Sequence, residues 1–103
     1  MNFGGMGNMI KQAQQMQARM AKLKEELAGR ECEASAGGGA VSVTASGDLQ
    51  LKKVLVSPEL LKDADPAMVQ DLFMTAANQA LAKAQEMAAA EMSKITGGFK
   101  LPF

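Results

Sequence analysis

Residues 31–56 read ECEASAGGGAVSVTASGDLQLKKVLV, and this stretch decides the fold. Apolar and polar residues alternate weakly over 31–36 and clearly over 41–45, which is the period of a half-buried β-strand. The glycines at 37–39 and a turn at 46–48 separate these runs, and a third strand is predicted over 49–56. We therefore expect a three-stranded antiparallel sheet.

The third predicted strand contains an irregularity. Leu49 and Leu51 have one parity, whereas Val54 and Val56 have the other, so strict alternation breaks at the lysine pair 52–53. The pattern predicts either a β-bulge or a strand with both faces covered. Lysines at such a position more often protect an edge strand from aggregation than bind phosphate.

A long helix is predicted before the sheet, over residues 8–28. Its apolar residues recur at intervals of four and three, which is typical of a helix that lies along another helix. Asn8 is the expected N-cap and Gly29 the expected stop. Residues 1–7 are rich in Gly and Met and are predicted to be a flexible leader. The stripe consists of Met9, Ala13, Met16, Met20, Leu23 and Leu27.

After the sheet, proline positions mark two helix starts. Pro58 follows Ser57 and opens a short helical turn over 59–62, and Pro66 follows Asp65 and opens a second long helix over 66–96. Gly97 and Gly98 end that helix, leaving residues 97–103 as a tail. The prediction is an α+β fold with an α-β-β-β-α protomer, two long helices and a single domain over residues 8–96.

Composition excludes several classes of function. The 103 residues contain no His and a single Cys, so the usual general base and a cysteine metal knuckle are both missing. We expect no enzyme, no cofactor, no metal and no small-molecule substrate. The lone Cys32 favours a reducing compartment, with a disulfide across a dimer as the alternative. No signal peptide or membrane span is predicted, so we expect a cytoplasmic protein without a membrane partner.

Charge is balanced overall but unevenly placed. The chain has 11 basic and 11 acidic residues. Residues 1–30 hold five of the basic and only two of the acidic ones, so the first helix is basic and the rest of the chain acidic. Lys11 and Lys22 are three helical turns apart, on the side away from the apolar stripe, with Arg19 and Lys24 beside them. This face could contact successive phosphates, although any solvated helix face can look the same.

The dimensions of the elements predict self-association. A helix over 8–28 is about 31 Å long, whereas the strands span only about 20–26 Å. Part of the apolar stripe must therefore extend past the sheet, and a second copy is the simplest cover for it. The dimer interface is predicted to consist of Met9, Met16, Met20, Leu23 and Leu27. A groove for a partner peptide and a membrane-binding face are weaker interpretations of the same stripe.

Several segments carry a resemblance to known proteins: FGGMGNMIKQAQQMQARM at the start, KKVLVSPELL at the strand-to-helix junction, AANQALAKAQE and EMSKITGG in the second long helix, and the terminal GFKLPF. Together these segments resemble the YbaB/EbfC family of bacterial nucleoid-associated proteins. The segment before GFKLPF looks shorter than in some members, so no role is assigned to the tail.

The resemblance implies a homodimer joined through its sheet, with helices projecting like tweezers. It also implies binding to duplex DNA in the nucleoid with little sequence preference, and an effect on nucleoid organisation and gene expression. By analogy, the contact residues are Lys11, Arg19, Lys22, Lys24, Lys83 and Lys94. The alternative is a protein-interaction module that docks helical partners of the replication or recombination machinery, which the neutral net charge favours.

Overall fold

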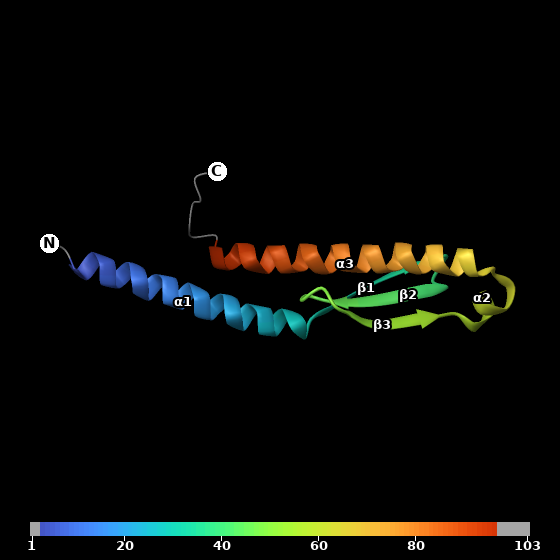
Figure 1. The fold of residues 1–103 in the computed structure, drawn as a ribbon, viewed down its shortest axis with the longest axis horizontal. Coiled ribbons are helices and arrows are strands. Elements are labelled where there is room, and N and C mark those ends of the chain that lie inside the picture. Colours follow the sequence, from blue (N-terminus) through green and yellow to red (C-terminus); the bar gives the residue numbers. More distant parts are fainter. Residues whose placement is uncertain (1–2, 97–103) are drawn as a thin grey trace, which may run out of the picture.

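The computed structural model describes residues 3–96, and within this range the chain forms three helices and three strands (Figure 1). The predicted α+β order is confirmed, as are the first strand, the bounds of the second long helix and the antiparallel sheet. The elements are α1 (Phe3–Ala28), β1 (Glu31–Ala36), β2 (Val41–Ser46), β3 (Leu51–Val56), α2 (Pro58–Asp63) and α3 (Pro66–Thr96).

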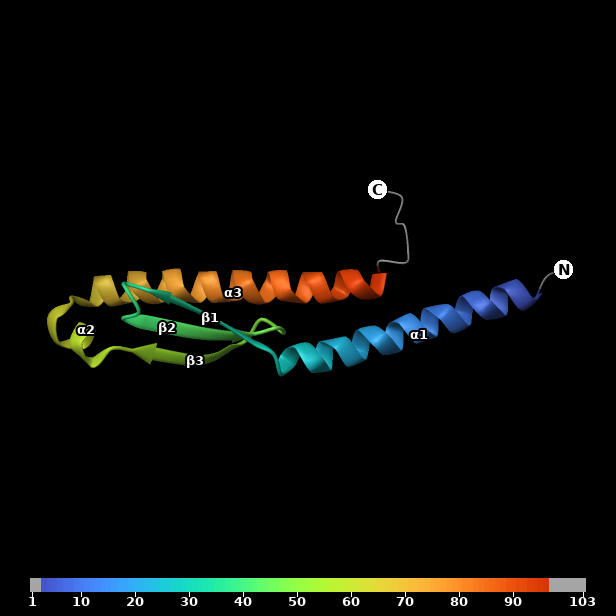
Figure 2. The same cartoon turned by 180° about the vertical axis from the view of Figure 1, so that it is seen from behind.

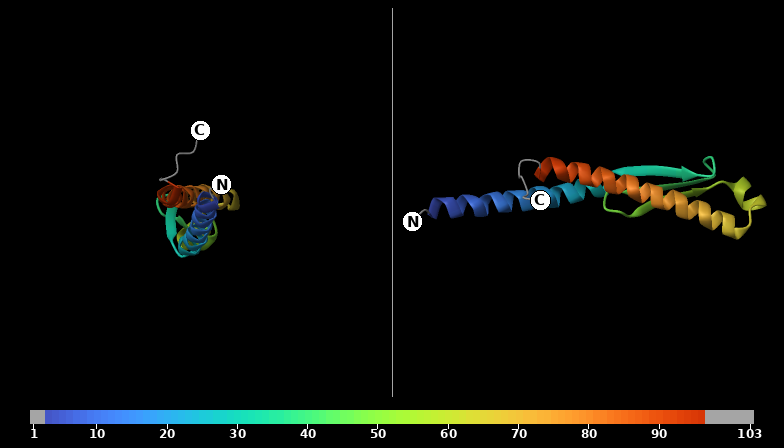
Figure 3. Two further views of the ribbon diagram at one scale, coloured as in Figure 1. Left: turned by 90° about the vertical axis from the view of Figure 1, so that its left-hand side faces the viewer. Right: turned by 90° about the horizontal axis from the view of Figure 1, so that it is seen from above.

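The molecule is elongated, with extents of 76 × 26 × 16 Å. Helix α3 runs along one side of the sheet and continues past its end (Figures 1 and 3). Helix α1 leaves the same end of the sheet, and its N-terminal half projects beyond the end of α3 (Figure 2). The two long helices are therefore adjacent only over the C-terminal part of each, where they contact one another.

The sheet has the order β1-β2-β3, with both neighbouring pairs antiparallel. The first turn places Gly37, Gly38 and Gly39 at φ values of 66°, 67° and 95°, a left-handed conformation that glycine adopts without steric cost. In the second pair, Thr44 is opposite Lys53 and Ala45 is opposite Leu51, so Lys52 is an extra residue on β3. The bulge alternative for this strand is confirmed.

The core lies between α3 and the first two strands. Val41, Val43 and Ala45 of β2 are fully buried, and so are Ala76, Ala80 and Ala84 of α3. The alanines recur every four residues and form one ridge along the helix. Because alanine has no side chain beyond Cβ, this ridge lets the helix axis approach the sheet closely.

Strand β3 lies outside this core except at Val56, which is half-buried and packs against it. Val54 is opposite Val43, and Leu51 is opposite Ala45, so both side chains are on the α3 side of the sheet. Helix α3 packs on β1 and β2, however, and Val54 and Leu51 stay 43% and 42% exposed. The described part of the chain thus leaves an apolar strip along β3 uncovered.

Helix α1 differs from the prediction at its beginning. It starts at Phe3, so residues 3–7 of the predicted leader are helical and Asn8 is not the N-cap, whereas residues 1–2 of that leader lie outside the described residues. The glycines in this stretch cost helix stability but do not end a helix as proline would. The predicted stop is confirmed, because α1 ends at Ala28, just before Gly29.

Two further local expectations had different outcomes. Asp65 caps α3, because its Oδ1 accepts a 2.9 Å hydrogen bond from the amide of Met68. Ser57 precedes α2 in extended conformation but makes no side-chain capping bond.

The third strand begins at Leu51, two residues later than predicted. Leu49 has a φ of 62°, and its amide closes the turn onto the Ser46 carbonyl oxygen at 2.8 Å.

Gly47 attaches the end of α1 to the β2–β3 turn. Its amide donates to the carbonyl oxygens of Leu27 at 2.9 Å and Arg30 at 3.0 Å. A Cβ at this position would lie 2.6 Å from the Leu27 carbonyl oxygen and 2.8 Å from the Leu27 Cβ. The absence of a side chain is therefore what allows α1 to join the sheet here.

Gly47→Ala should lower the free energy of unfolding by about 1–3 kcal/mol, because backbone must shift to relieve the overlap. Gly29→Ala is the matched control, since its nearest neighbour would be the Glu26 carbonyl oxygen at an ordinary 3.6 Å. Urea unfolding of both variants at one protein concentration measures the difference. Equal stability of the two variants would contradict this role for Gly47.

Candidate nucleic-acid interface

A cleft lies between α1 and the C-terminal part of α3, and we call it the interhelical cleft. Two adjoining hollows form it, of about 190 and about 250 Å³, and they share Arg19 and Ile95. Polar, basic and apolar side chains line the smaller hollow, and the larger one is also lined by acidic side chains. The lining residues are Gln12, Gln15, Met16, Arg19, Lys22, Leu23, Glu26, Glu91, Lys94 and Ile95.

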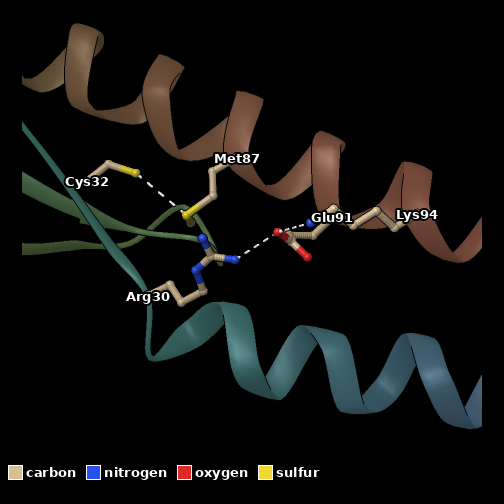
Figure 4. A network of polar contacts seen from close by, with 5 residues as sticks. All are labelled: Arg30, Cys32, Met87, Glu91 and Lys94. Atoms are coloured by element: carbon tan, nitrogen blue, oxygen red, sulfur yellow. Dashed lines mark hydrogen bonds and ion pairs between the residues drawn. The ribbon is translucent and has the colours of Figure 1, made fainter.

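An ion network links the residues after α1 to α3, and two of its members, Glu91 and Lys94, line this cleft (Figure 4). Oε1 of Glu91 lies 3.1 Å from the Arg30 guanidinium and 3.2 Å from the Lys94 ammonium. Arg30 follows the end of α1, whereas Glu91 and Lys94 are on α3, so the network ties the two helices together. Close by, the Cys32 thiol lies 3.8 Å from the sulfur of Met87 and faces α3 from β1.

The network favours the charged form of Glu91. The pKa of its carboxyl lies below the ordinary value, first because Arg30 hydrogen-bonds it and second because Lys94 does. Glu91 is therefore ionised at neutral pH, and its negative charge belongs to the cleft.

The predicted contact residues divide into two groups. Arg19, Lys22 and Lys94 come together at the interhelical cleft, all exposed. The other three lie elsewhere. Lys11 is exposed on the projecting half of α1, and Lys24 lines a different groove. The Lys83 ammonium donates to the Glu33 carbonyl oxygen of β1 at 3.0 Å.

The predicted interface stripe is also divided. Leu23 and Leu27 are 6% and 2% exposed, because the protomer itself covers them. These two residues were expected to contact another copy, but they are already buried within a single protomer. Met9 is 70% exposed, and Met16 and Met20 are half-buried.

Beside α1 lies a second, mainly apolar groove of about 500 Å³, between the end of α1, the β2–β3 turn and α3. It adjoins the uncovered side of β3 through Leu49, which is 47% exposed. Its lining residues are Lys24, Leu27, Gly47, Asp48, Leu49, Gln85, Ala88, Ala89 and Met92.

The described part of the chain contains neither a metal-site cluster nor a membrane-spanning helix. Among residues 3–96, no three His, Cys, Asp or Glu side chains are grouped as a metal ion would require. In the same part of the chain, no helix combines the length and apolar character needed to cross a membrane.

Residues 1–99 match the model of the YbaB/EbfC DNA-binding family. The chain belongs to this family. A nucleoid-associated protein of Acetivibrio thermocellus is 52% identical over 97 residues, which cover 93% of this chain and 86% of the relative. One of Moorella thermoacetica is 49% identical over 102 residues, covering 99% and 98%. The expected resemblance is confirmed, and with it DNA as the partner of the family.

The YbaB/EbfC fold of the chain is also seen in a solved structure. An uncharacterized protein of Helicobacter pylori superposes with a TM-score of 0.75, covering 94% of this chain and 99% of that one. Its sequence is 24% identical, so the match concerns the fold alone.

Glu91→Gln should make the protein slightly less stable at neutral pH but not in acid, because both cations of the network are half or more exposed and the ion pairs contribute little. The pKa of the Glu91 carboxyl is lower in the folded state than its ordinary value of 4.5. The ionised carboxylate therefore stabilises the fold at pH values above 4.5, and this stabilisation is lost as the pH falls through the lowered pKa. Melting temperatures of wild type and variant should therefore differ at pH 7 and converge in acid. A constant difference across pH would contradict the network's role. Glu86→Gln, an exposed change on the same helix, is the control.

Proposed function

We propose that this YbaB/EbfC protein binds duplex DNA as a homodimer with little sequence preference, contacting phosphates through α1 and the end of α3. The observation that carries the proposal is the convergence of Arg19, Lys22 and Lys94 on the interhelical cleft. Lysine and arginine side chains on helices contact phosphates without reading bases. Such contacts would coat DNA in the nucleoid.

The charge of α1 supports this proposal. The first acidic residue of the chain is Glu25, so the projecting part of α1 carries only positive charge, beginning with Lys11. A projecting helix without acidic residues attracts a polyanion even though the whole chain has no net charge. Lys11 and Lys24 would add phosphate contacts outside the cleft, and Lys83 would do so once released from Glu33.

Arg19→Gln with Lys22→Gln should weaken binding to a short duplex by about tenfold at low salt. It should also reduce the slope of log K against log salt by about 2, because two phosphate contacts are lost. Lys52→Gln with Lys62→Gln removes the same charge from exposed sites outside the cleft and is the matched control. Fluorescence anisotropy across a salt series measures both variants.

Scrambled duplexes of equal length should bind wild type within a few-fold of one another. The proposal is wrong if wild-type binding does not depend on salt, or if the two double variants behave alike.

For the dimer, we propose that the uncovered side of β3 is the main joint. Leu51 and Val54 expose apolar surface there, next to the apolar groove. Lys52 and Lys53 are exposed on the same strand and oppose addition of another strand at its edge, which favours packing of faces. Met9, Met16 and Met20 on α1 form the second contact proposed between copies.

Val54→Lys should raise the dimer dissociation constant by at least about tenfold, because a charge would be buried without a partner. Met68→Lys is the control, since Met68 is 52% exposed on α3 and lies outside the proposed joint. Sedimentation equilibrium measures the constants, and circular dichroism checks the fold. A monomeric wild type, or equal effects of the two lysines, would count against the proposed joint.

A further inference from the structure

The most unusual feature of the interhelical cleft is an acidic side chain, that of Glu91, in its lining. A single carboxylate oxygen of Glu91 accepts from two cations, Arg30 in the α1–β1 connection and Lys94 on α3. The Glu91 side chain is 24% exposed, whereas those of Arg30 and Lys94 are 50% and 73% exposed. The carboxylate thus lies inward and the cations around it reach solvent.

This arrangement has the chemistry of a phosphate site. Arginine and lysine donate to carboxylate and phosphate oxygens in the same way, through short charge-assisted hydrogen bonds. Arg19 and Lys22 line the same cleft from α1. Glu91 therefore has two cations in ion pairs and shares the lining of the cleft with two more, and Glu26 is the other acidic residue of that lining.

We propose that Glu91 is a built-in competitor of DNA. It occupies Arg30 and Lys94 in the free protein, and a backbone phosphate of the duplex takes its place. This inference rests on the proposed DNA binding and goes further, because it assigns a phosphate site to Arg30 and Lys94 and an opposing role to Glu91. Glu91 would thus lower the affinity for duplex DNA although it makes no favourable contact with the DNA.

The energetics allow such an exchange. An ion pair whose cations are half or more exposed contributes little to stability, so breaking it costs little. The displaced carboxylate would remain in a cleft that now holds a phosphate, and the two like charges repel. Both effects make binding weaker than it would be with a neutral side chain at position 91.

The test compares Glu91→Gln with Glu86→Gln. Both variants raise the net charge by one on the same helix, but Glu86 is exposed and has no ion pair among residues 3–96. Anisotropy with one duplex at several salt concentrations should show about fivefold tighter binding for Glu91→Gln and less than twofold for Glu86→Gln. The salt slope of Glu91→Gln should be steeper, by up to about 2.

A second comparison isolates the two cations. In a background carrying Arg30→Gln and Lys94→Gln, the further change Glu91→Gln should lose its advantage and behave like Glu86→Gln. Equal effects of the two glutamine variants in the wild-type background, or weaker binding by Glu91→Gln, would overturn the inference while leaving DNA binding intact. Absence of salt-dependent binding by wild type would instead reject the proposed function, and the inference with it.

Discussion

The contact between the alanine ridge of α3 and the buried face of β2 is the constraint on which the rest of the structure depends. Ala76, Ala80 and Ala84 are fully buried against the valines of β2. Alanine loses no side-chain entropy on burial and has high helix propensity, so a ridge of alanines serves both the helix and its packing. The ridge fixes the direction of α3 relative to the sheet.

The direction of α3 relative to the sheet forms the interhelical cleft, because it places the end of α3 beside α1. The 31 residues of α3 extend about 46 Å, whereas a six-residue strand spans about 20 Å. The part of α3 beyond the sheet carries Glu91 and Lys94 alongside the C-terminal half of α1. Gly47, which joins the end of α1 to the sheet, and the ion pair of Arg30 with Glu91 hold the other wall of the cleft. The basic residues converge because two rigid helices leave the same end of one sheet.

Local signals in the sequence were enough for most of the fold. The period of two predicted the strands, and Asp65 with Pro66 predicted the start of α3. The parity break at the lysine pair 52–53 left two interpretations, a bulge or a strand with both faces covered, and the structure has the bulge, at Lys52. The start of α1 was not predictable from glycines, because they weaken a helix without ending it. A periodic stripe also does not identify its partner. Leu23 and Leu27 therefore looked like a seam between copies although the protomer covers them.

The site was predictable only in part. The basic character of α1 is visible in the sequence, and so are Arg19 and Lys22 as neighbours on one face. Arg30 and Glu91 are distant in sequence and meet only because α3 passes the end of α1, so no spacing rule could find them. Lys83 and Lys94 share a helix, but Lys83 lies over β1 whereas Lys94 reaches the cleft.

The account holds that a duplex contacts the walls of the interhelical cleft, and an amide chemical-shift titration of the labelled protein tests this most directly. Addition of a short duplex should perturb the amides of residues 11–26 and 90–95 most and those of α2 and β3 least. Perturbations concentrated on α2 and β3, with the cleft amides unchanged, would contradict the account.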